Sequence, residues 1–400
     1  MKAKLGFVLL VGLLLCSGSA WAMVNGQCSD CHTMHNSQDG STVTSDGNLH
    51  RSLTTGDCVG CHTGTNVTGG NIPYVMTPAL TEYGPDYDSS GNLVNAAATN
   101  SLAGGTFNMV STTDSYGHNV IGISNADTAI GYTPPGWIPS TFQASNGGGS
   151  DAVGDINGAN SDWGTTQLTC AGTNGCHGSH TNADDFADIR GAHHGDDTGG
   201  TGIDGSTIAK SYRFLRGIIG LEDNDWELTV SATDHNQYYG VDRTSTTTAG
   251  MDAQTISYLC AECHGLFHSN DGSTSGSGII FNGPTIDNAN PWLRHPTDFA
   301  LSTAGGEYLD YADANGNLAA SSGVTAVYNF VAPLASADVT TVISNPFTGT
   351  ENDVVTCLSC HRAHGSAHDD LLRWDYAEMV AGTTTGFDNK GCFACHTTKD

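Results

Sequence analysis

The chain has 400 residues, of which 38% are hydrophobic and only 14% are charged, and its formal net charge is −28. A surface this acidic repels nucleic acid and anionic membranes, so we expect no nucleic-acid partner and favour cationic, metal or protein partners. The chain has 52 glycines and few apolar residues for its length, so something other than aliphatic packing is expected to fill its core.

The first predicted element is an export signal. Lys2 and Lys4 precede an apolar run at 5–15, and "SAWA" follows at 19–22. This pattern is typical of a signal peptide, so residues 1–22 are expected to be removed, Cys16 among them, leaving 23–400 as the mature chain. No later run approaches the roughly 18 apolar residues that a membrane span requires, so the mature chain is not expected to span a membrane.

Six cysteine pairs follow in the mature chain, and a histidine closes each of them. They are CSDCH (28–32), CVGCH (58–62), CAGTNGCH (170–177), CAECH (260–264), CLSCH (357–361) and CFACH (392–396). A disulfide scaffold does not need these histidines, thioredoxin-like pairs lack them, and structural zinc would leave its remaining ligands at irregular spacing. The sequence C-x-x-C-H instead predicts c-type haem, held by two thioether bonds with the histidine on the iron.

Six haem c groups are therefore expected. The attachment residues would be Cys28, Cys31, Cys58, Cys61, Cys170, Cys176, Cys260, Cys263, Cys357, Cys360, Cys392 and Cys395, and the proximal iron ligands His32, His62, His177, His264, His361 and His396. The third motif departs from the others because five residues separate Cys170 from Cys176. A loop containing Gly172 and Gly175 would still let both cysteines reach one haem, and a disulfide between them is the alternative.

Eleven other histidines are available as second ligands of the irons. Four of them recur three or four residues after a motif histidine: His35, His180, His268 and His364. If these segments are helical, the two histidines share one face, so the second cannot bind the opposite side of the same iron and must reach another haem. The alternative for each is a surface histidine.

Two more histidines stand in short distinctive settings, His118 in "YGHN" and His295 in "WLRHP", and they complete six distal ligands for six irons. The remaining histidines are His50, His193, His194, His235 and His368. For the adjacent pair at 193–194 we expect a solvated loop.

The intervals between motifs predict the fold class. Residues 63–169, 178–259 and 265–356 are rich in Gly, Ser, Thr and Asn, which favour turns and loops. We therefore expect a single multihaem cytochrome c domain over 23–400, mostly irregular coil with short helices and a few hairpins wrapped around a chain of six haems. Residues 369–380 are predicted to form a helix. "DSSGNL" (88–93) and "DANGNL" (313–318) are predicted to be hairpin turns, with bound calcium as an alternative.

Taken together, these motifs resemble the extracellular hexahaem cytochromes of the OmcS type, which polymerise into conductive filaments. The resemblance lies in CHTMHNS (31–37), GHN (117–119), SYRFLRG (211–217), LRHP (293–296), CLSCHRAH (357–364) and CHTTKD (395–400). It implies bis-histidine haems stacked in parallel and perpendicular pairs. It also implies a head-to-tail homopolymer in which His35 ligates the haem of Cys357 and Cys360 in the adjacent subunit. A head-to-tail contact that does not close produces an open filament.

The predicted function is electron transfer, because irons with two histidines leave no position open for a substrate. The chain would be an electron carrier and not an enzyme. It would be secreted through the periplasm to the outer surface or extracellular space, where it passes respiratory electrons to other redox proteins or metal oxides. Two alternatives are a monomeric periplasmic or outer-surface shuttle and a multihaem reductase of nitrite, hydroxylamine or sulfur oxyanions, which would need a five-coordinate haem.

Overall fold

The computed structural model describes the chain in separate stretches: residues 27–44, 47–77, 86–87, 93–95, 102–137, 163–194, 203–243, 251–268, 295–311, 328–347, 351–382 and 391–398. The predicted signal peptide at 1–22, Cys16 and the predicted turn at 313–318 lie outside these residues, as do the side chains of His194 and His268.

The described helices are short. The α-helices are α2 (Cys28–Cys31), α3 (Cys58–Cys61), α5 (Asp185–Asp188), α6 (Ile256–Cys263), α7 (Gly265–His268) and α8 (Leu301–Ala304). The 3₁₀-helices are η1 (Arg51–Leu53), η2 (Asp114–Tyr116), η3 (Ala192–His194), η4 (Ile208–Lys210), η5 (Tyr212–Phe214), η7 (Gly306–Asp310), η8 (Cys357–Ser359), η9 (Asp369–Leu371), η10 (Tyr376–Glu378) and η11 (Gly391–Ala394). Within the described stretches, no helix has both the length and the apolar character that crossing a membrane requires.

The described strands form two-stranded sheets only. The antiparallel pairs are β1 (Ser37–Gln38) with β2 (Ser41–Thr42), β3 (Asp86–Tyr87) with β4 (Leu93–Asn95), β7 (Gly220–Leu221) with β8 (Gln237–Tyr238), and β9 (Phe299–Ala300) with β10 (Val354–Val355). β5 (Thr169–Ala171) and β6 (Gly175–His177) are parallel. The β3–β4 pair flanks the predicted turn at 88–93, of which residues 88–92 lie outside the described stretches. Coil with short helices and small hairpins is the predicted fold class, and the structure confirms this part of it.

The interior is divided among several small apolar clusters, and the motif cysteines line them. One cluster joins Ile218, Ala335 and Val354, and Cys176 packs against it. A second cluster around Leu334 and Trp374 contacts three further motif cysteines: Cys360, Cys392 and Cys395. These four cysteines therefore pack against the core.

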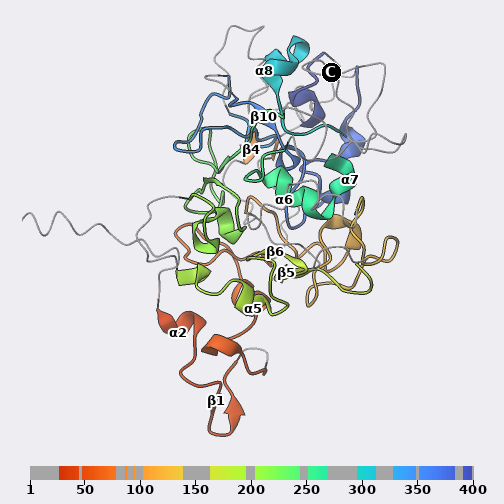
Figure 1. The fold of residues 1–400 in the computed structure, drawn as a ribbon. Helices are drawn as coiled ribbons and strands as arrows, with labels where there is room; N and C mark the ends of the chain where they lie inside the picture. The colour runs from red at the N-terminus through yellow and green to blue at the C-terminus, as the bar shows by residue number, and fades with distance from the viewer. Residues whose placement is uncertain are drawn as a thin grey trace, which may run out of the picture.

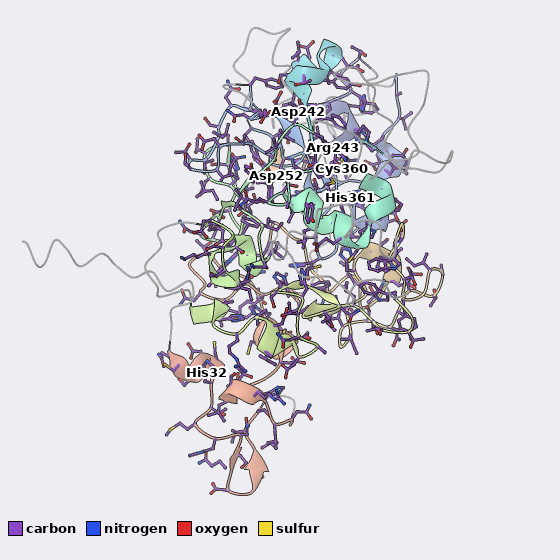
Figure 2. The ribbon with its side chains drawn as sticks, viewed as in Figure 1. His32, Asp242, Arg243, Asp252, Cys360 and His361 are labelled. Atoms are coloured by element: carbon purple, nitrogen blue, oxygen red, sulfur yellow. The ribbon has the colours of Figure 1, made fainter. Side chains whose placement is uncertain are left out.

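The N-terminal segment extends from the rest of the molecule. In Figure 1 the red segment with α2 and β1 projects at one end, while α8 and the C-terminus lie at the other. Figure 2 shows His32 in this N-terminal arm and Cys360 and His361 in the opposite half of the molecule.

The prediction of a helix over 369–380 is wrong. The described chain forms the separate turns η9 and η10 there, and Asp370 and Leu371 have φ values of 58° and 60°. The carbonyls of these two residues accept hydrogen bonds from the His361 ring and the Arg362 backbone, so they are not available for the bonds of an α-helix. Tertiary contacts override the local helix propensity.

Candidate functional site

In the five C-x-x-C-H motifs a single helical turn brings the cysteines and the histidine together. The histidine N–H donates to the carbonyl of the first cysteine at 2.8 Å in the first two motifs, 2.9 Å in the fourth and 3.0 Å in the last two. Capping side chains start two of these helices, Asp57 for α3 and Thr255 for α6, and at η8 the Ser359 hydroxyl accepts from the Thr356 backbone N–H at 3.0 Å. The three reactive side chains thereby leave the backbone within one turn, as attachment to one planar group requires.

The third motif reaches a similar result through a different backbone. In the parallel β5–β6 pair, Thr169 lies opposite Gly175 and Ala171 lies opposite His177, which places Cys170 opposite Cys176. A Cβ at Gly175 would lie 2.6 Å from the Ala171 backbone, so the tight return of the loop requires glycine there. The five intervening residues therefore form a loop that returns the second cysteine beside the first.

None of the twelve motif cysteines forms a disulfide in this structure. The disulfide considered for Cys170 and Cys176 is therefore not formed.

Each motif lies beside the motif that follows it in the sequence. A hydrogen bond with Cys170 raises the pKa of Cys58, and one with Cys357 raises the pKa of Cys260. At the other successive motifs, burial raises the pKa of one cysteine and a thiol of the adjacent motif raises it further. The cysteine and the neighbouring thiol are Cys31 and Cys61, Cys263 and Cys176, and Cys395 and Cys360. The six motifs thus form a spatial series in sequence order.

Most of the motif histidines have their Nδ1 within hydrogen-bond distance of a backbone carbonyl. The contacts are His32 with Ser52 (2.9 Å), His62 with Pro73 (2.8 Å), His177 with Arg213 (2.9 Å), His264 with Pro135 (2.7 Å) and His361 with Asp370 (2.7 Å). Nδ1 of His396 instead lies 3.7 Å from Oε1 of Glu307. A carbonyl at Nδ1 selects the tautomer that carries the proton on this nitrogen, which leaves the Nε2 lone pair for a metal.

The first, third and fifth motifs share a backbone feature that we call the carbonyl clasp. It consists of two consecutive left-handed residues: Ser52–Leu53, Arg213–Phe214 and Asp370–Leu371, all with φ between 48° and 61°. The first carbonyl of each pair accepts from the motif histidine ring. The second accepts from the backbone N–H after that histidine, over 2.7–2.9 Å. These non-glycine residues adopt a costly conformation, which the two hydrogen bonds to the motif help to hold.

Four motif histidines face one other histidine each at a narrow range of distances. The ring centroids are 6.3 Å apart for His62 and His193, 6.4 Å for His177 and His364, 6.2 Å for His264 and His118, and 6.1 Å for His396 and His295. An imidazole nitrogen lies about 2.0 Å from a bound metal. Two imidazoles on opposite sides of one iron therefore have centroids about 6 Å apart, since each centroid lies roughly 1 Å beyond its nitrogen. The donor set fits a bis-histidine haem at each of these motifs.

Burial keeps several of these imidazoles neutral, as metal ligation requires. It lowers the pKa of His62, His118 and His177, and it lowers the pKa of His364 to about 3. Protons therefore compete weakly for these nitrogens at neutral pH.

Three of the six predicted distal histidines, His118, His295 and His364, lie opposite a motif histidine. His35 is exposed. His180 is buried, with its Nε2 2.9 Å from the Cys176 carbonyl and its Nδ1 3.9 Å from Glu262, so its ring is engaged with the third and fourth motifs. The side chain of His268 lies outside the described residues, and its assignment stays a prediction. Only this segment is helical after its motif, as α7.

His193 faces His62, although the sequence analysis placed it in a solvated loop. Its position in "AHHG" gives no spacing relative to a motif, so only chain folding brings it to His62. The other unassigned histidines make different contacts. His50 packs near Phe186, His235 stacks on Tyr328 at 3.6 Å, and burial lowers the pKa of His368. No group of three or more His, Cys, Asp or Glu side chains able to hold a bare metal ion occurs in the described part of the chain.

Comparison with known proteins finds similar sequences and solved structures. The model of the doubled CXXCH motif matches residues 346–400. The C-type cytochrome OmcS of Geobacter sulfurreducens is 26% identical, and the match covers 94% of this chain and 85% of that protein. A solved structure of the outer membrane cytochrome S filament from the same organism matches with a TM-score of 0.45 and 22% identity, over 95% of this chain and all of that one. A cryo-EM structure of the OmcS nanowires matches with a TM-score of 0.43 and 21% identity over the same shares of the two chains. The resemblance to OmcS-type multihaem c-type cytochromes, predicted from the motifs, is confirmed.

Proposed function

We propose that this chain is a hexahaem electron carrier that polymerises into an extracellular filament. The observation that carries the proposal is the set of four histidine pairs at 6.1–6.4 Å, each joining a motif histidine to a histidine from elsewhere in the chain. With both axial positions taken by imidazole, each iron would supply one-electron exchange and no substrate site. The residues of 23–400 would then form one domain that holds six irons in place and excludes water from them.

The spatial order of the motifs supports conduction along the chain. Thiols of successive motifs are neighbours from the first motif to the sixth. Haems attached to them would lie in the same order, with one end in the N-terminal arm at His32 and the other near the C-terminus at His396. An electron entering at one end would leave at the other.

The surroundings of His35 support a head-to-tail polymer. His35 is exposed on the projecting arm, which also exposes Met34 (86%) and Leu49 (69%). Large exposed apolar side chains around a metal-binding group suit contact with another copy of the chain. The arm would dock on the face of the next subunit that carries the fifth motif, including Cys357 and Cys360.

The fifth motif suggests which iron His35 reaches. His364, three residues after His361, faces His177 and would therefore ligate the iron of the third motif. His35 stands in the same position relative to His32 in the first motif. His364 thus reaches two motifs back along the series. Two motifs back from the first motif lies the fifth motif of the adjacent subunit, whose His361 would then be paired with His35.

The test is the His35→Ala variant, purified after export with haem attached. We expect intact mass to show six haems in both wild type and variant, because His35 takes no part in attachment. The wild type should form filaments visible by negative-stain electron microscopy, while the variant stays monomeric in size-exclusion chromatography and shows one high-spin iron.

His368→Ala is the matched control, since His368 faces no motif histidine, and it should form filaments with six low-spin irons. Filaments from the His35→Ala variant would contradict the bridging ligand. A wild type that is monomeric at high concentration would favour the shuttle, and a high-spin iron in wild-type filaments would favour a reductase.

A further inference from the structure

The third motif differs from the other two clasp motifs in what surrounds the clasp. We propose that Arg213, held by Glu222 and Asn236, is a positioning residue for the haem of Cys170 and Cys176, and that this charged network sets the potential of that iron. The inference rests on the proposed function, because it requires a haem at the third motif.

The connection between Arg213 and the iron ligand is direct. The Arg213 carbonyl accepts the hydrogen bond from Nδ1–H of His177 at 2.9 Å, and the Phe214 carbonyl accepts from the Gly178 backbone at 2.9 Å. A stronger or better oriented acceptor at Nδ1 makes the imidazole a more basic ligand. Any group that fixes the Arg213 carbonyl therefore acts on the iron through His177.

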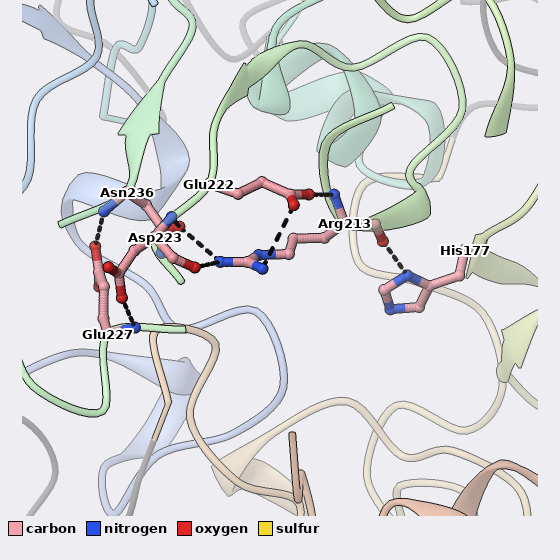
Figure 3. A network of polar contacts seen from close by, with 6 residues as sticks. All are labelled: His177, Arg213, Glu222, Asp223, Glu227 and Asn236. Atoms are coloured by element: carbon pink, nitrogen blue, oxygen red, sulfur yellow. Dashed lines mark hydrogen bonds and ion pairs between the residues drawn. The ribbon is translucent and has the colours of Figure 1, made fainter. Parts of the chain in front are cut away.

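The side chain of Arg213 fixes its own backbone. Glu222 accepts from the Arg213 backbone N–H at 2.6 Å with Oε1, while its Oε2 lies 3.6 Å from the guanidinium Nη1. The guanidinium Nη2 donates to the Asp223 carbonyl at 2.7 Å and to Oδ1 of Asn236 at 3.0 Å. Figure 3 shows this closed arrangement, with His177 at one side of it.

A buried second layer fixes the partners of Arg213 in turn. Oδ1 of Asn236 also accepts from the Asp223 backbone at 3.0 Å, and the Asn236 backbone donates to Glu227 at 2.8 Å. Glu227 closes the layer by donating its backbone N–H to Asp223 at 2.6 Å. Asn236 is only 1% exposed, so the network cannot exchange these bonds readily with water.

The equivalent residues of the other two clasps make no comparable network. Ser52 and Asp370 have the same left-handed backbone and the same hydrogen bond to a motif histidine, yet both are exposed. Of the three residues at the first position of a clasp, Arg213 is the one whose side chain is bonded within the protein. The network is therefore an addition to the clasp and is not needed to form it.

The charges of the network predict opposite effects for two substitutions. A positive charge near an iron favours its reduced form, and a negative charge favours its oxidised form. Arg213→Gly keeps the carbonyl and suits φ = 48° but leaves Glu222 uncompensated, so the potential of one haem should fall. Glu222→Gln keeps an acceptor for the Arg213 N–H but leaves the guanidinium uncompensated, so the same potential should rise. Damage to packing alone would move both variants in one direction.

The experiment is a redox titration of the six-haem protein, followed by electron paramagnetic resonance of the low-spin irons. Wild type, Arg213→Gly, Glu222→Gln and the double variant are compared, with intact mass as the check of haem attachment. We expect the midpoint potential of one of the six haems to fall in Arg213→Gly and to rise in Glu222→Gln. In the double variant it should return toward the wild-type value. Ser52→Gly, which changes the same clasp position in the first motif, should leave all six components in place.

Unchanged potentials in both single variants, or shifts in the same direction, would overturn the inference that the charges of this network set the potential, while leaving six haems and the proposed function intact. A wild type with five haems and free thiols at Cys170 and Cys176 would overturn this inference. It would also overturn the proposal that the third motif carries a haem. The two failures are thus distinguished by mass before any titration.

Discussion

At the scale of the residue, the histidines divide according to what each ring nitrogen contacts. Rings such as His62 and His177 bond a carbonyl through Nδ1 and face a second imidazole. His180, in contrast, bonds a carbonyl through Nε2. Whether a ring faces a motif histidine separates candidate ligands from histidines engaged elsewhere better than its distance from a motif in the sequence, since His235 also bonds a carbonyl through Nδ1 but stacks on Tyr328.

His193 gives the sharpest test of this rule. Replacing it with alanine should leave six attached haems but remove the second ligand from the iron at His62, which then becomes five-coordinate. We expect one high-spin ferric signal in electron paramagnetic resonance, together with slow binding of added cyanide or imidazole. His50→Ala, which removes a histidine lying beside Phe186, is the control, and a fully low-spin His193→Ala protein would show that another residue ligates this iron.

At the scale of the element, buried polar side chains replace long helices and wide sheets in holding the loops. Asp188 at the end of α5 is 1% exposed. It accepts from the Ser179 hydroxyl at 2.7 Å and from the His180, Thr181, Asn182 and Gly172 backbones at 2.8–3.2 Å. One carboxylate thus organises the segment that follows the third motif, where no repeating backbone pattern could do so.

Asp188→Asn should lower the free energy of unfolding by about 2 kcal/mol at neutral pH. The reason is that the two charged carboxylate oxygens, which accept several hydrogen bonds, are replaced by the single neutral oxygen of an amide. Burial by itself would raise the pKa of Asp188, but the hydrogen bonds from Ser179, His180, Asn182 and Thr181 outweigh it, and the net pKa is lowered. The stabilisation is therefore present above the pKa of the unfolded state and is lost as the pH falls through the lower pKa of the folded state.

Urea unfolding of the wild type and the Asp188→Asn variant between pH 3 and 7 measures both effects. The difference between the two proteins should be largest at neutral pH and shrink in acid. Asp39→Asn changes an exposed residue with φ = 53°, where asparagine is tolerated, and should change stability by less than about 0.5 kcal/mol. A difference that grows in acid would contradict the assigned role of Asp188.

At the scale of the whole molecule, the described clusters of apolar side chains are small and separate, and motif cysteines line them. Two-stranded sheets and helices of at most eight residues give few backbone hydrogen bonds far from solvent in the described part of the chain. We therefore expect such a chain to depend on large planar apolar groups between its loops, in the way that small domains depend on metals or disulfides.

Without haem attachment, the same chain should therefore fail to fold cooperatively. Expression in a strain that lacks cytochrome c maturation should yield a colourless product with rapid backbone hydrogen exchange and no sharp thermal transition. The haem-loaded protein should show protected amides around α6 and the β9–β10 pair. A colourless product with a cooperative transition would show that the polypeptide core is sufficient by itself.

The sequence by itself determined the chemistry of attachment, because each cysteine pair and its histidine lie within a few residues and act through local geometry. It also indicated the coil-rich fold through its glycine and polar composition. It could not decide which histidines face one another, as His193 shows. It also could not decide the backbone over 369–380, where a helix was expected and separate turns form. Those outcomes depend on contacts between segments far apart in the chain, such as the carbonyls of Asp370 and Leu371 that bond the fifth motif. Tertiary structure decided which motif histidine each of these imidazoles faces, because a distance of about 6 Å between two rings depends on how segments far apart in the chain pack together.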